Sequence, residues 1–131
     1  MTPAEAIAAV REAFADVPRP ETFTRGTCSC DECIEHGETL AAHTPDDIGM
    51  EELGHPAWDP ICAANDPAFA YYLPAMVRLA LEEDYWDQLL FHLNVPGRVD
   101  ALVPRQARAL LDALWALAEV KAEEISAHFG I

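Results

Sequence analysis

Four residues with soft metal-binding side chains lie within one short segment of the chain. Cys28, Cys30, Cys33 and His36 follow one another as Cys-x-Cys-x-x-Cys-x-x-His, and this segment holds three of the four cysteines of the protein. Thiolates and an imidazole in a set of four close the tetrahedral shell of a zinc ion and leave no position for water or substrate. The segment therefore predicts a structural zinc site formed by Cys28, Cys30, Cys33 and His36.

The spacing of these ligands supports zinc only in part. Two residues separate Cys30 from Cys33, which is common in metal knuckles, and His36 follows one helical turn later. The step from Cys28 to Cys30 is tighter, because paired zinc ligands are usually separated by about two to four residues. His43 and Cys62 are the substitutes if Cys28 or His36 points away from the ion.

A redox role is the main alternative for the same cysteines. Cys30 and Cys33 form a Cys-x-x-Cys pair, and a helix that starts near Cys30 would favour a thiolate there. The acidic neighbours Asp31, Glu32 and Glu35 act in the opposite direction and disfavour an unbound thiolate, whereas a bound dication would reverse their effect. The sequence leaves open a metal site, a redox pair and plain reduced thiols.

Motifs of known enzyme mechanisms do not occur in the chain. It has no Gly-x-Ser-x-Gly elbow, no His-Glu-x-x-His pair and no phosphate-binding loop, so the sequence favours a binding protein over an enzyme. His55 is expected to be a hydrogen-bonding loop residue, and His92 is expected at the edge of the core. A third possible function is metal-independent binding of a small ligand or a protein partner by aromatic side chains, namely Trp58, Tyr71, Tyr72 and Trp86.

Composition and charge limit the partners. The 131 residues include 8 Lys and Arg against 23 Asp and Glu, giving a formal charge of -15. Such a surface repels phosphate backbones and anionic lipid, so nucleic acid and membranes are poor partners. No signal peptide or apolar run of about 20 residues is visible, and we expect a cytoplasmic protein. The oligomeric state is not indicated.

Hydrophobic periodicity predicts an all-α fold, a small orthogonal or bundle-like helical domain that comprises residues 1–131. Cap residues and prolines mark several helix starts, such as Thr2-Pro3 and Asn65-Asp66-Pro67. Pro74 is expected to kink the central helix or to start a new one. The expected helices cover residues 3–16, 31–42, 66–81, 85–93 and 104–128, with a long, partly helical irregular connection over residues 43–66.

One stretch of the central helix resembles a known pattern. Pro67-Ala68-Phe69-Ala70-Tyr71-Tyr72-Leu73-Pro74-Ala75, followed by Pro104-Arg105-Gln106, is similar to uncharacterised bacterial families with an aromatic-Tyr-Tyr-Leu-Pro-Ala helix motif. The cysteine-rich segment and Gly54-His55-Pro56-Ala57-Trp58-Asp59-Pro60 also look like conserved bacterial proteins of unknown function. The resemblance implies a helical fold and gives no activity. Within the motif, Phe69 and Tyr72 are expected in the core and Tyr71 on another face.

Overall fold

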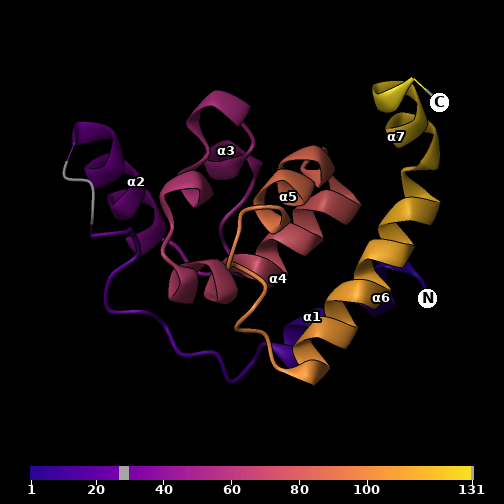
Figure 1. Cartoon of the computed structure of the whole chain (residues 1–131), viewed down its shortest axis with the longest axis horizontal. Helices are drawn as coiled ribbons and strands as arrows, with labels where there is room; N and C mark the ends of the chain where they lie inside the picture. The colour runs from indigo at the N-terminus through magenta and orange to yellow at the C-terminus, as the bar shows by residue number, and fades with distance from the viewer. Residues whose placement is uncertain (27–29, 131) are drawn as a thin grey trace.

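The computed structural model describes residues 1–26 and 30–130 and confirms the all-α prediction (Figure 1). The described residues form α-helices, short 3-10 turns and one isolated antiparallel bridge between Thr24 and Ala64. The α-helices are α1 (Pro3–Ala13), α2 (Asp31–Ala41), α3 (Met50–Leu53), α4 (Asp66–Glu82), α5 (Trp86–Leu93), α6 (Pro104–Val120) and α7 (Ala122–Phe129), and the 3-10 turns are η1 (Pro56–Trp58) and η2 (Pro60–Ala63).

The central helix α4 organises the core. Ten of its residues are buried, and it packs against α1, α5 and α6. Its start is capped as expected, since the Asn65 side chain accepts a hydrogen bond from the Ala68 amide at 2.9 Å. The helix continues through Pro74 instead of restarting there. Burial of apolar side chains on both sides of Pro74 outweighs the roughly 3 kcal/mol that an interior proline costs.

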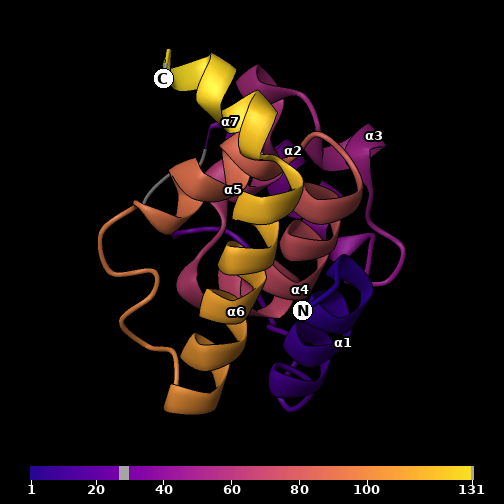
Figure 2. The same ribbon diagram turned by 90° about the vertical axis from the view of Figure 1, so that its right-hand side faces the viewer.

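The two ends of the chain pack together. Helix α1 begins with a capping box, in which Thr2 and Glu5 bond each other's backbone amides, and it lies beside α6 (Figure 2). An exposed ion pair between Arg105 of α6 and Asp16 lies at the end of this contact. Helix α1 ends at Ala13, three residues before the predicted end.

The last helix is not one continuous rod. We expected a single helix over residues 104–128, but α6 ends at Val120 and α7 begins at Ala122. The hinge is Lys121, whose backbone leaves the helical region at φ -108 and ψ 17, and whose ammonium lies 3.7 Å from Glu124. This break lets α7 turn toward α5, where His128 stacks edge-on against Trp86. Gly130 ends α7 in the left-handed conformation, at φ 71.

The irregular connection after α2 is held by side-chain bonds to its carbonyls. Arg78 donates to the carbonyls of Pro45 and Ile48, and Gln88 donates to the carbonyl of Leu53. Buried Ile48, Leu53 and Ile61 anchor it in the core. These contacts hold the segment before α3 against α4 and hold α3 against α5, and η2 packs against both α2 and α3.

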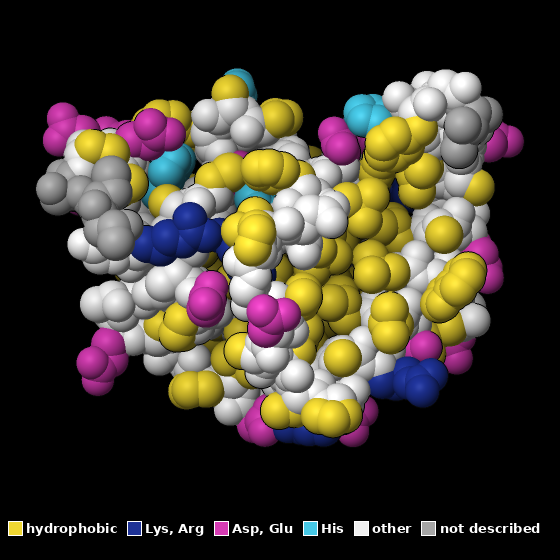
Figure 3. Space-filling view, in the orientation of Figure 1, with side chains coloured by type: hydrophobic (Ala, Val, Ile, Leu, Met, Phe, Trp, Pro, Cys, Tyr) yellow, Lys and Arg dark blue, Asp and Glu magenta, His cyan; other side chains and the backbone are white. Residues whose placement is uncertain are grey.

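Apolar side chains remain visible on one face of the molecule, between α5 and α6 (Figure 3). On α6 itself, Leu111 and Trp115 are one helical turn apart and are 55% and 72% exposed. No helix among residues 1–26 and 30–130 combines the length and the apolar character needed to cross a membrane.

Candidate metal centre

Three of the four predicted zinc ligands lie at the start of α2. Cys30 is the N-cap residue, and its carbonyl accepts the first helical bond from the Ile34 amide at 3.1 Å. Cys33 and His36 follow in the first and second turns of the helix. Cys28, the fourth predicted ligand, lies outside the described residues.

The segment before the cysteines is tied to the segment after η2. Beside the bridge between Thr24 and Ala64, the Arg25 amide donates to the Ala63 carbonyl at 3.2 Å. Asn65 donates from its side chain to the carbonyls of Thr22 and Thr24. Helix α2 lies close against this segment at Gly37, where a Cβ atom would be 3.2 Å from Thr24 Cγ2. Gly37 therefore permits a close approach of α2 to this segment.

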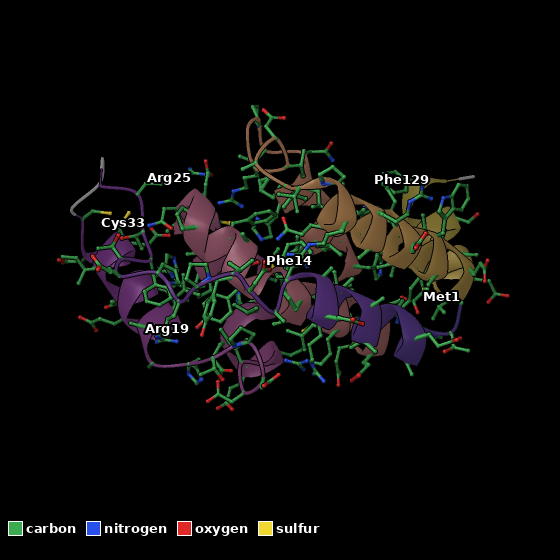
Figure 4. All side chains as sticks on the ribbon, turned by 90° about the horizontal axis from the view of Figure 1, so that it is seen from below. Met1, Phe14, Arg19, Arg25, Cys33 and Phe129 are labelled. Atoms are coloured by element: carbon green, nitrogen blue, oxygen red, sulfur yellow. The ribbon has the colours of Figure 1, made fainter. Side chains whose placement is uncertain are left out.

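These contacts bring Cys62 to the cysteines of α2. A pocket of about 350 Å³ is lined by side chains from α2, η2 and the segment before the cysteines, namely Arg25, Cys30, Glu32, Cys33, His36, Cys62 and Ala63. Arg25 and Cys33 mark this end of the molecule in Figure 4. Cys62 is 29 positions after Cys33, so no local spacing rule could place the two together. Cys62, one of the two substitute ligands named from the sequence, thus lines the same pocket as the predicted ligands Cys30, Cys33 and His36.

His36 is the buried donor of this pocket. Its side chain is 4% exposed and its ring lies 4.6 Å from the ring of Trp58, which covers it from η1. Its Nδ1 atom is buried and has no hydrogen-bond partner in the described part of the chain. Its Nε2 atom is 3.5 Å from Glu32 Oε1, which is long for a hydrogen bond. A buried ring nitrogen without a partner costs about 1–3 kcal/mol, and a metal ion would satisfy it.

The thiol of Cys62 is held in its protonated form. Partial burial of the sulfur, together with the nearby Asp59 carboxylate, raises the pKa of Cys62, although Arg98 and Arg25 counteract this effect. A thiol with a raised pKa is a poor nucleophile. A bound dication would deprotonate it, because the metal's own charge dominates the local electrostatics.

The described donors do not yet form a finished coordination shell. Across residues 1–26 and 30–130, no three His, Cys, Asp or Glu side chains are grouped closely enough to hold an ion. A shell of four ligands would therefore need the pocket side chains to move closer together around an ion, whether or not Cys28 is one of them.

His43, the other substitute named from the sequence, lies elsewhere. Its Nδ1 atom is 3.3 Å from Asp47, and its carbonyl accepts bonds from Arg19 and Tyr72 at the end of α2. It lines a different pocket, shared with Glu38, Glu51 and Trp58. The structure thus pairs Cys62, and not His43, with the cysteine cluster.

Next to Cys62 lies a buried polar network that the sequence did not predict. Asp59 is 2% exposed, and its Oδ2 atom accepts bonds from Tyr85 at 2.6 Å, His92 at 2.8 Å and Gln88 at 2.9 Å. Its Oδ1 atom accepts the Ile61 amide at 3.0 Å, which caps η2. His92 was expected at the edge of the core but is 1% exposed within this network. The one local signal was Asp59 before Pro60, a residue order that suits a cap.

The network balances a buried negative charge with a buried positive one. Arg98 donates to His92 Nδ1 at 3.3 Å and to the carbonyls of Ile61 and Ala64. Because Arg98 can only donate, His92 Nδ1 accepts, and His92 Nε2 carries the proton that is donated to Asp59. All hydrogen-bonding atoms of Asp59 and His92 are used within the protein. The network therefore stabilises the fold and positions η2, and with it Cys62.

The aromatic residues proposed for a ligand pocket lie in different places. Trp58 covers His36, while Trp86 contacts His128. Tyr72 is buried and hydrogen-bonded to the carbonyls of Leu40 and His43, as its predicted core position requires. Tyr71 is partly exposed on another face of α4, as predicted. The four side chains do not converge on one pocket.

Comparisons of the chain with family models, with curated proteins and with solved structures give no match. We therefore infer the function from the residues of the chain itself.

Proposed function

We propose that the protein is a small helical binding or interaction protein with a structural zinc ion at the start of α2, beside the η2 segment. Cys30, Cys33 and His36 supply three ligands, and Cys28 or Cys62 supplies the fourth. A zinc ion with four protein ligands has no open position, so the ion is structural and not catalytic.

One observation carries this proposal: Cys30, Cys33, His36 and Cys62 line a single pocket although η2 is far from α2 in the sequence. The buried Nδ1 atom of His36, which lacks a partner among the described residues, adds a donor for which an ion would provide the missing contact. Zinc fits this donor set better than magnesium or calcium, because thiolates are soft ligands and those ions prefer oxygen.

The choice of the fourth ligand decides what the ion does. Cys28 would close the site within one short segment, so the ion would only order the start of α2. Cys62 would join α2 to η2 and to the Asp59 network behind it, so the ion would fasten the irregular connection to the rest of the domain. In both cases the binding free energy of the metal adds to the folding free energy.

A thiol redox function of Cys30 and Cys33 is the second candidate. It is favoured by the position of Cys30, which is exposed to solvent at the start of α2, three residues before Cys33. Reversible formation of a Cys30–Cys33 disulfide in metal-free protein, together with fast alkylation of one thiol, would support it. Slow, ordinary thiol reactivity would remove it.

The wider setting of the protein is also a proposal. The charge of -15 supports a cytoplasmic protein that binds neither nucleic acid nor membranes, and the Tyr71-Tyr72-Leu73-Pro74 segment supports membership of an uncharacterised bacterial family. The partner would be another protein or a small molecule.

Cobalt substitution tests both the site and its ligands. Co²⁺ bound to thiolates in a tetrahedral site gives strong visible absorption, so titration of reduced wild-type protein should end at one equivalent. Cys33→Ser should lose most of the absorption. The fourth ligand is whichever of Cys28→Ser and Cys62→Ser also loses it.

His43→Gln is the matched control, because His43 follows the opposite end of α2 and lies outside the pocket. It should bind cobalt like the wild type. Absence of thiolate-to-cobalt absorption in the wild type would refute the proposal, and so would equal absorption in wild type and Cys33→Ser.

A further inference from the structure

A second pocket lies on the other side of α4, away from the cysteines. It has a volume of about 220 Å³ and is enclosed by α1, α4 and the turn between α2 and α3. Tyr71, Pro74 and Ala75 of the central helix motif all line it. The zinc proposal leaves this motif without a role, and the pocket gives these residues a common location.

The charge of this pocket differs from that of the molecule. Arg11 and Arg78 line it together with a single acidic residue, Asp46, so its formal charge is +1 in a chain of -15. Arg11 and Asp46 are 3.5 Å apart, with 60% and 83% of their side chains exposed. Such an exposed ion pair contributes little, and an incoming anion can compete with Asp46 for Arg11.

Arg78 is held in place while part of its guanidinium stays available. Its Nη2 atom donates to the carbonyls of Pro45 at 3.1 Å and of Ile48 at 2.8 Å, and the side chain is partly buried. Its Nη1 and Nε atoms make no hydrogen bond to a described residue. Both edges of the guanidinium that could make two parallel bonds include Nη2, so Arg78 can offer an anion single charge-assisted hydrogen bonds from Nη1 or Nε.

The remaining walls are apolar. Ile7, Phe14 and Val17 form the α1 side, and Pro74 and Ala75 form the α4 side. Pro74 has no N–H, so the carbonyl of Ala70 receives no helical bond from it and α4 has an acceptor to spare near this wall. Apolar walls with a few fixed polar groups are typical of small-molecule sites.

We propose that this pocket binds a small organic anion, a free carboxylic acid with a compact apolar body, because a volume of about 220 Å³ between apolar walls leaves room only for a small ligand. The carboxylate pairs with Arg78 and Arg11, and the body packs between Phe14 and Tyr71. The site is separate from the proposed zinc centre and does not depend on it.

Isothermal titration calorimetry with four probes tests this assignment. Phenylacetate supplies both the charge and the apolar body, 2-phenylethanol supplies the body alone, and acetate supplies the charge alone. N-acetylphenylalanine stands for the carboxyl end of a peptide. Phenylacetate should bind, and each of the other three should bind at least tenfold more weakly.

Substitutions locate the binding. Arg11→Gln should weaken phenylacetate about threefold to fivefold, as expected for an exposed charge. Arg78→Lys should weaken it about tenfold, because the lysine lacks the guanidinium that the Pro45 and Ile48 carbonyls hold in place. Arg11 is exposed, so its variant keeps the test valid if Arg78→Lys fails to fold. Arg108→Gln, on α6 and outside this pocket, makes the same charge change and should bind phenylacetate like the wild type.

The proposal is overturned if phenylacetate does not bind, or if it binds no better than 2-phenylethanol. It is equally overturned if Arg11→Gln and Arg108→Gln weaken binding to the same extent, because the effect would then be one of net charge. Binding of N-acetylphenylalanine that is as tight as that of phenylacetate, or tighter, would overturn the assignment to a small acid, because the carboxyl end of a peptide would then fit the pocket.

Discussion

At the scale of single residues, two buried polar side chains, Asp59 and His36, differ in how their hydrogen-bonding atoms are used. Asp59 accepts four hydrogen bonds and faces Arg98 through His92, so it is fully satisfied. His36 is buried with an unpartnered Nδ1 atom among the described residues. A buried group with all its hydrogen bonds made stabilises the fold, whereas a buried group without a partner marks a place where a water or an ion can bind.

Asp59→Asn should destabilise the protein by about 3–5 kcal/mol, because it leaves Arg98 buried without a counter-charge and turns an amide toward the donors of Tyr85, Gln88 and His92. The measurement is the free energy of unfolding from urea titration. Asp87→Asn is the control, since the Asp87 side chain is 59% exposed and its loss should change stability by less than about 0.5 kcal/mol. Equal effects of the two substitutions would contradict the structural role of the network.

Two buried phenols predict a loss of stability at alkaline pH. Burial raises the pKa of Tyr72 from 10.0 to about 12, and burial together with the Asp59 carboxylate raises the pKa of Tyr85 further. Below pH 10 both states keep these protons. Between pH 10 and 12 the unfolded chain loses them while the folded chain retains them, so stability falls by up to ~1.4 kcal/mol per pH unit for each tyrosine. Tyr72→Phe should make this fall shallower, and an unchanged slope would be inconsistent with the buried Tyr72 hydroxyl.

At the scale of elements, helix starts were predictable and long-range contacts were not. Thr2-Pro3 and Asn65-Asp66-Pro67 begin α1 and α4 because capping and proline preferences act within a few residues. The break at Lys121 was missed, because apolar residues recur at helical spacing on both sides of it, and the contact of His128 in α7 with Trp86 in α5 joins residues far apart in the sequence. Cys62 could be named as a substitute ligand but could not be placed, since its position depends on bonds made by Asn65 and Arg98.

Helix α4 gives a direct test of the assigned faces. Tyr72 is fully buried and hydrogen-bonded, whereas Tyr71 is partly exposed and lines a pocket. Tyr72→Ala should cost about 3–5 kcal/mol of unfolding free energy, and Tyr71→Ala should cost much less. Thermal and urea unfolding of both variants make the comparison. Similar losses at the two positions would show that the faces of α4 are wrongly assigned.

At the scale of the whole molecule, repulsion among the many acidic side chains destabilises the fold, whereas burial of the apolar core stabilises it. Acidic residues outnumber basic ones by 23 to 8, and the few arginines are used at specific contacts, such as Arg19 at the end of α2 and Arg98 in the Asp59 network. This imbalance can be counted directly from the sequence. The sequence could not show that Arg11 and Arg78 line one apolar pocket, because the packing of α1 on α4 brings them together.

Self-repulsion of the acidic surface predicts that salt stabilises the protein. Raising NaCl from about 0.02 M to 0.5 M shortens the Debye length from roughly 20 Å to about 4 Å and screens repulsion across the surface. The melting temperature should therefore rise by a few degrees. Sucrose at equal osmolality serves as the uncharged comparison. A melting temperature that falls with salt would mean that attractive ion pairs outweigh the repulsion.

The proposed zinc ion in the cysteine pocket can be measured by native mass spectrometry of protein purified without chelator or metal-affinity steps. We expect one zinc per chain in the wild type, the same in His43→Gln, and none in Cys33→Ser. We also expect that a strong chelator lowers the melting temperature of the wild type, because metal binding adds to folding stability. A metal-free wild type that takes up no zinc when the reduced protein is titrated with it would contradict the proposal.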